Sequence, residues 1–206
     1  MKTIYSIIVI AVVLGFTSCT TADNEVFGET SLFESVKSIY GVEYASYNIE
    51  NTTDIPSVST EEMRSVLETL RQESKSLHDY TVTSEGKNQK VVMTGKYKIA
   101  TRGVDVEEFA LQVALKFSFE KGKVYYWGTD YSYSSDMFDW RAQGLTLTPV
   151  KGGDLYTYAF ESESYLYFRV NDQANALVQV AIVFKGDYNF ESGNGTYSFQ
   201  LLKDCK

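Results

Sequence analysis

The chain is poor in the residues on which most catalytic and metal sites depend. Its 206 residues include one histidine, two cysteines and two prolines. A single imidazole cannot supply two ligands of a zinc site, and two cysteines cannot build a four-cysteine metal centre. The sequence also has no Gly-x-Ser-x-Gly, His-Glu-x-x-His, Walker or Gly-x-Gly-x-x-Gly pattern, which leaves a nucleophile-elbow hydrolase, a zinc protease and a nucleotide-binding enzyme without support. We therefore expect no cofactor and no metal, and we assign no catalytic residue.

Basic residues are also scarce. The chain has 19 Lys and Arg against 27 Asp and Glu, a formal net charge of -8. Nucleic-acid binding needs a basic stripe that displaces counterions from phosphates, so nucleic acid is not an expected partner. Aromatic residues, by contrast, make up 15% of the chain and include 16 tyrosines. Aromatic side chains suit pleated sheet surfaces, and this composition favours β structure.

The one long apolar run lies at the N-terminus. Lys2 precedes an apolar stretch from Ile4 to Phe16 that is interrupted only by Ser6 and Gly15. The stretch is too short for a spanning helix and is typical of a secretory signal. We expect residues 1–18 to form a signal peptide.

The end of that run carries a more specific pattern. Small residues stand just before a cysteine in Leu14-Gly15-Phe16-Thr17-Ser18-Cys19, which resembles the lipobox of bacterial lipoproteins. Phe16 departs from the commonest form and is similar to the looser lipobox of Bacteroidota. The resemblance implies cleavage before Cys19, lipid on Cys19, and anchoring in the cell envelope at the outer membrane, with the periplasmic or surface side open. The alternative is a plain secretory signal with an incidental cysteine.

Beyond the cysteine we expect a tether over residues 19–29 and one domain over residues 30–206. Ser31 with Glu34 predicts a helix that ends before Gly41. Ser59 with Glu62 forms a second capping box, and apolar residues at helical spacing predict an amphipathic helix over residues 60–77. The residues at helical spacing are Met63, Val66, Leu67, Leu70 and Leu77, and we expect the first four to be buried on the sheet. His78 would then lie at the helix C-terminus, where an imidazole interacts favourably with the helix dipole.

Most of the remaining chain has the alternation of strands. The expected strands cover residues 42–49, 91–99, 109–119, 124–128, 145–148, 155–160, 165–170, 177–184 and 196–202. Asn194-Gly195 is a type I′ hairpin signal. We predict an α+β fold, an open antiparallel β-meander of about eight strands with the amphipathic helix packed on it. A small lipocalin-like β-barrel is the alternative, because closure removes exposed sheet edges.

Aromatic residues are densest between Tyr125 and Trp140, which we expect to be a strand end running into a long loop. Flat aromatic faces with acidic residues between them suit a sugar or a peptide. The candidate ligand-binding residues are Trp127, Tyr131, Tyr133 and Trp140, of which the last three would form a partly exposed platform. The alternative is an aromatic plug that closes the end of the core.

Two functional hypotheses follow from these features. The first is a lipid-tethered, non-catalytic binding or accessory module for a glycan or protein ligand. The second is a small hydrolase that uses two carboxylates, which can meet in a fold from any positions in the sequence. We favour the first, because no pattern selects a catalytic pair among the 27 acidic residues.

Overall fold

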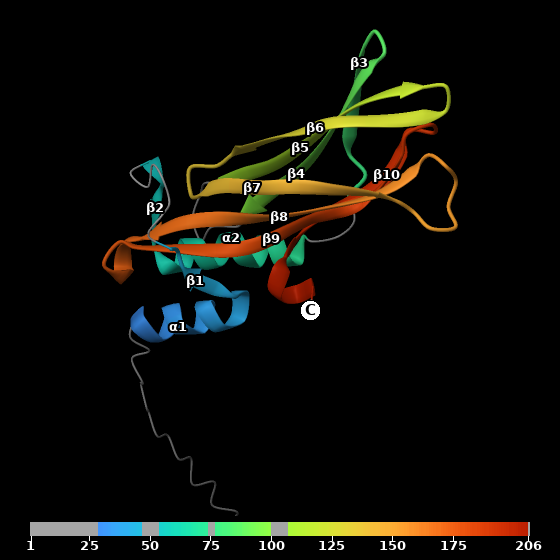
Figure 1. Ribbon diagram of the computed structural model, residues 1–206. Coiled ribbons are helices and arrows are strands. Elements are labelled where there is room, and N and C mark those ends of the chain that lie inside the picture. The colour runs from blue at the N-terminus through green and yellow to red at the C-terminus, as the bar shows by residue number, and fades with distance from the viewer. Residues whose placement is uncertain (1–28, 47–53, 74–76, 100–106, 206) are drawn as a thin grey trace, which may run out of the picture.

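The structure is a computed structural model that describes residues 29–46, 54–73, 77–99 and 107–205 (Figure 1). The predicted signal peptide, the lipidation site at Cys19 and nearly all of the predicted tether lie outside the described residues. The tether was predicted to reach residue 29, whereas the first helix already begins at Glu29.

Two helices and ten strands make up the described part of the chain. The helices are α1 (Glu29–Tyr40) and α2 (Thr60–Gln72), with short 3-10 turns η2 (Asn171–Gln173) and η3 (Leu202–Cys205). The first five strands are β1 (Val42–Tyr44), β2 (Ser57–Val58), β3 (Tyr80–Glu85), β4 (Asn88–Ile99) and β5 (Glu107–Glu120). The others are β6 (Lys123–Ser134), β7 (Asp139–Pro149), β8 (Thr157–Val170), β9 (Ala176–Asn189) and β10 (Asn194–Leu201).

The strands form two sheets (Figure 1). Strands β3, β4, β5 and β6 follow one another in a four-stranded meander. The six-stranded sheet has the order β1-β9-β8-β2, with β10 also paired to β9 and β7 to β8. All pairs are antiparallel except β2 with β8. The predicted α+β fold with an antiparallel meander is confirmed, and the sheets do not close into a barrel.

Several strand boundaries differ from the sequence prediction, and β8 and β3 are two examples. The predicted strands 155–160 and 165–170 are one continuous strand, β8, in which Ser162 and Ser164 point into the core between apolar neighbours. The continuity was not predicted, because these two polar residues interrupt the apolar alternation in the sequence. Strand β3 was not predicted, because it is an exposed edge strand without an alternating apolar face.

Helix α2 begins as predicted and ends earlier. The capping box between Ser59 and Glu62 is present, and Met63, Val66, Leu67 and Leu70 are fully buried. The predicted end at Leu77 is wrong: the helix stops at Gln72, and Leu77 instead forms a bridge with Tyr197 of β10. The backbone pairing of Leu77 with a sheet is incompatible with helical hydrogen bonding. His78 is therefore exposed beside this bridge and does not cap a helix.

The core lies between the two sheets and is closed on one side by α2, which packs against β4, β8 and β10. Phe138 joins the sheets, because its ring contacts Phe109 of β5 and Phe168 of β8. Helix α1 packs against α2, β1 and η2, on the side of the molecule remote from the four-stranded sheet (Figure 1). None of the helices in the described ranges is both long and apolar enough to cross a membrane.

The turns follow the sequence signals with one shift. Gly41 ends α1 with φ +71°, as predicted for a helix stop. The turn between β9 and β10 lies before Asn194-Gly195, not on it, because Asn194 already pairs with Asn189. Gly193, with φ +70°, provides the left-handed residue of this turn.

Candidate functional site

A β-bulge divides the aromatic residues of β6 between two faces of the sheet. Phe117 of β5 pairs with Tyr126 and Lys116 pairs with Gly128, so that Trp127 is an extra residue on β6. Uninterrupted alternation would place Tyr125, Trp127, Tyr131 and Tyr133 on one face, because side chains alternate with period two. The extra residue reverses that alternation for the rest of the strand.

Tyr125, before the bulge, and Trp127, its extra residue, both face solvent. Tyr125 is 52% and Trp127 55% exposed. The Nζ atom of Lys116 lies 5.7 Å from the centroid of the Trp127 ring. Lys116 points away from the core, since its neighbours Leu115 and Phe117 are fully buried. Trp127 therefore lies on the outer face of the four-stranded sheet.

Charged side chains cluster beside Trp127 on this outer face. Asp130 forms an ion pair with Lys116, with 2.5 Å between Oδ1 and Nζ. Its Oδ2 atom lies 3.6 Å from the Nζ atom of Lys90. The hydrogen bond from Lys116, together with the charges of both lysines, lowers the pKa of Asp130 below its ordinary value. Asp130 is thus held as a carboxylate between two ammonium groups.

A row of polar groups crosses the same face one step further along the strands. Gln112 donates from Nε2 to the Thr94 hydroxyl at 3.0 Å and accepts at Oε1 from the Ser132 hydroxyl at 3.0 Å. Between this row and Lys116 lies Ala114, which is buried. We call this surface the Trp127 face; its residues are Lys90, Thr94, Gln112, Ala114, Lys116, Tyr125, Trp127, Asp130 and Ser132.

The residues beyond the bulge pack inward. The Tyr131 hydroxyl lies 3.1 Å from Ser162 Oγ, and its ring meets Trp140 edge-on. Trp140 is 6% exposed and also contacts Phe199. The prediction that Trp140, Tyr131 and Tyr133 form a partly exposed platform is therefore wrong for Trp140, which belongs to the core. Tyr131 is half-buried against it.

Tyr133 lies at the rim of this inner cluster. It is 40% exposed, its ring stacks on Phe138, and its hydroxyl donates to Asp139 Oδ1 at 2.7 Å. Partial burial and this hydrogen bond raise the pKa of Tyr133 to about 12. Of the four predicted ligand-binding residues, Trp127 alone lies on the Trp127 face.

Most of the aromatic segment lies in strand β6, and not in the long loop that was predicted. Strand β6 continues to Ser134 and β7 begins at Asp139, so four residues connect them. Met137 and Phe138 of this connection are buried. The alternative of an aromatic plug thus describes the inner cluster.

The two lysines of the Trp127 face were not predicted from the sequence, although the acidic residues of the aromatic segment were noted. Lys90, Lys116 and Asp130 come from three strands, and their proximity depends on the register between those strands. The sequence shows only which residues of each strand lie on its polar face. It does not show the register between the strands, which brings these three side chains together.

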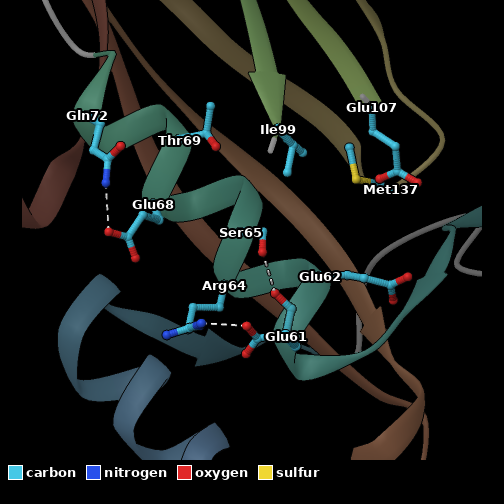
Figure 2. Close-up of a pocket in the computed structure, with 10 residues that line it drawn as sticks. All are labelled: Glu61, Glu62, Arg64, Ser65, Glu68, Thr69, Gln72, Ile99, Glu107 and Met137. Carbon is cyan, nitrogen blue, oxygen red and sulfur yellow. Dashed lines mark hydrogen bonds and ion pairs between the residues drawn. The ribbon is translucent and has the colours of Figure 1, made fainter. Parts of the chain in front are cut away.

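A groove beside α2 is the second candidate site (Figure 2). Its volume is about 360 Å³, and its lining residues are Glu61, Glu62, Arg64, Ser65, Glu68, Thr69, Gln72, Ile99, Glu107 and Met137. Figure 2 shows α2 along one side of the groove, with Ile99, Glu107 and Met137 on the other. The groove therefore combines an acidic helix face with the ends of the neighbouring strands.

Three of the four carboxylates in this groove already hold structural contacts. Glu61 pairs with Arg64 at 2.5 Å, and Glu62 caps α2 through Ser59. Glu68 accepts from Tyr40 and Gln72. In the part of the chain that the structure describes, no three His, Cys, Asp or Glu side chains gather in a metal-binding arrangement. The Trp127 face is thus the better candidate site, since its aromatic rings have no comparable structural use.

The described residues form a two-sheet α+β protein that carries an exposed aromatic and charged surface, the Trp127 face. Residues 24–201 match a family model described as a domain of unknown function, DUF5033. The chain belongs to this family. No curated protein and no solved structure matches the chain.

Proposed function

We propose that the protein is a lipid-anchored, non-catalytic binding module of the cell envelope, and that it binds a glycan on the Trp127 face. The observation that carries this proposal is the pair of aromatic side chains, Tyr125 and Trp127, each more than half exposed. Large exposed aromatic groups beside hydrogen-bonding groups are typical of ligand-binding surfaces. Asp130, Lys90 and Lys116 supply charged acceptors and donors for sugar hydroxyl groups.

The bulge at Trp127 supports a binding role for the same face. A regular strand would have placed Asp130 and Ser132 toward the core, whereas the bulge brings both to the surface that carries Trp127. Bulges are frequent at sheet edges beside functional sites, where they redirect side chains. The local irregularity thus assembles ring and polar groups on one surface.

The lipid anchor is proposed from the sequence. The pattern ending in Cys19 is that of a lipobox, and nine residues separate Cys19 from Glu29 at the start of α1. Even fully extended, this segment spans at most about 35 Å. Helix α1 lies on the side of the molecule remote from the four-stranded sheet (Figure 1). An anchor at Cys19 would leave the Trp127 face directed away from the membrane.

The anchor is tested by replacing Cys19 with Ser. We expect a fatty-acid analogue fed to the cells to label the wild-type protein and not the Cys19→Ser variant, which should leave the membrane fraction. Label on the variant would contradict the assignment of Cys19.

Glycan binding is tested on an array with the full chain purified in detergent. We expect binding that the Trp127→Ala variant loses. Tyr44→Ala is the matched control, because Tyr44 is an equally exposed aromatic residue on β1 of the other sheet. Absence of binding, or equal loss in both variants, would overturn the proposal.

A further inference from the structure

We infer that the glycan bound by the Trp127 face is acidic, an oligosaccharide whose sugars carry carboxylate groups. This inference rests on the proposed function and names the class of ligand for the same site. It is carried by the charge of this face, which is opposite in sign to that of the chain as a whole.

Several lysines lie on the outer face of the four-stranded sheet, although the protein as a whole is acidic. Strand register and alternation assign the following positive side chains to this face: Lys90, Lys96, Lys98, Lys116 and Lys123. The negative side chains of the face are Glu85, Glu108, Glu120 and Asp130. The face is thus positive by one charge, whereas the whole chain has a formal net charge of -8.

One unbalanced positive charge lies at the centre of the face. At one end Lys98 pairs with Glu108 at 3.1 Å, and at the other Glu120 pairs with Lys87 of the neighbouring turn at 3.3 Å. In the centre, Asp130 is the shared partner of two lysines. One carboxylate neutralises one ammonium group, so the centre retains a positive charge that a ligand carboxylate can neutralise.

The central charge lies within reach of a sugar on Trp127. Lys116 is 5.7 Å from the Trp127 ring centroid, and Lys116 and Lys90 share Asp130. The carboxylate of a uronic acid is attached directly to the sugar ring. A uronate that stacks on the indole therefore brings its charge to the same cluster, while a neutral sugar gains only the stacking and the hydrogen bonds.

A nucleic acid is a poorer occupant of this face. A polyphosphate presents many closely spaced charges and needs an extended basic stripe. Here the surplus is a single charge on a chain that is otherwise acidic. Ring stacking with a local cation fits an isolated carboxylate on a sugar.

The experiment compares acidic oligosaccharides with their own neutral forms. Oligomers of galacturonate, glucuronate and mannuronate, each as the free acid and as the methyl ester, are titrated calorimetrically into the full chain in detergent at low salt. We expect at least one free acid to bind about two- to fivefold more tightly than its ester, the range expected for one exposed charge pair, and the difference to shrink as salt is raised.

Two lysine variants assign the preference to the Trp127 face. Lys90→Gln removes the surplus cation and leaves the closer ion pair between Lys116 and Asp130 in place, so we expect acid and ester to bind equally. Lys151→Gln, which changes an exposed lysine in the turn after β7, makes the same charge change away from the face and should keep the preference.

The outcomes separate this inference from the proposed function. Equal binding of acids and esters by the wild-type protein would overturn the inference and leave a neutral-glycan module. Equal effects of Lys90→Gln and Lys151→Gln would also overturn it. Binding of no oligosaccharide on either this panel or the array would overturn both, and binding of DNA that Lys90→Gln weakens would replace the glycan with a nucleic acid.

Discussion

The two tryptophans of the chain lie in opposite surroundings although they are close in sequence. Trp127 is 55% exposed on the outer face of β6, whereas Trp140 is 6% exposed in the core between β7 and β10. Both belong to the same aromatic segment. The comparison shows that aromatic density marks a segment of interest but does not tell a binding surface from a core.

What separates them is the backbone. The bulge at Trp127 reverses the alternation of β6, so Tyr131 turns inward and meets Trp140. One inserted residue thus divides the segment into a solvent-facing part and a packed part. The following predictions test that division, beginning with the largest expected effect.

Truncation of Trp140 should have the largest effect on stability. We expect Trp140→Ala to lower the free energy of unfolding by about 3–5 kcal/mol, because it leaves a cavity between Tyr131 and Phe199. Chemical denaturation followed by circular dichroism measures this loss. Trp140→Phe should cost clearly less, since it keeps a ring and, among the residues that the structure describes, the buried indole Nε1 has no hydrogen-bond partner to lose. A loss below 1 kcal/mol for Trp140→Ala would show that this residue is not in the core.

Helix α2 gives the second prediction, with an internal control. Leu70 is fully buried, so Leu70→Ala should lower the free energy of unfolding by about 2–5 kcal/mol. Arg64 pairs with Glu61 on the exposed side of the same helix, and Arg64→Ala should cost no more than about 1 kcal/mol. Equal effects in denaturation experiments would mean that the buried face of α2 is assigned wrongly.

The regular elements and the candidate site also differ in how far the sequence predicts them. The buried face of α2 and the inward residues of β5 follow directly from periodicity, because a helix and a strand each repeat with a fixed period. Leu111, Val113 and Leu115 all lie in the core as their alternation indicates. Where no extra residue interrupts the period, the local pattern was enough to predict which side chains are buried.

The candidate site was less predictable for the same reason. A bulge is one extra residue, and nothing in the alternation of Tyr125 to Tyr133 shows where it lies. The pairing of Lys116 with Asp130 depends on that bulge and on the register of two strands. From the sequence, Trp127 was therefore named as a candidate without the lysines beside it, and Trp140 was offered as a platform residue with the buried plug as the alternative.

The ion pair on the Trp127 face should make a small, pH-dependent contribution. The pKa of Asp130 is lowered in the folded protein, so its stabilisation is present above the ordinary carboxyl pKa of about 4 and is lost as pH falls through the lower folded value. We expect Asp130→Asn to cost about 0.2–1 kcal/mol at pH 7, because the pair is exposed, and less as the pH is lowered and the carboxylate becomes protonated. Denaturation of both proteins between pH 7 and acidic pH measures the difference, and a cost that does not change with pH would contradict an electrostatic origin.

Truncation of Trp127 should have the smallest effect on stability. Its indole is mostly in solvent, so we expect Trp127→Ala to change the free energy of unfolding by no more than about 0.5 kcal/mol. Proteins with a single tryptophan extend the test to the folded state. Trp140→Phe leaves Trp127, whose fluorescence acrylamide should quench strongly, whereas Trp127→Phe leaves Trp140, which should be protected. If both proteins are quenched equally, the two tryptophans share one environment and the bulge does not divide the aromatic segment.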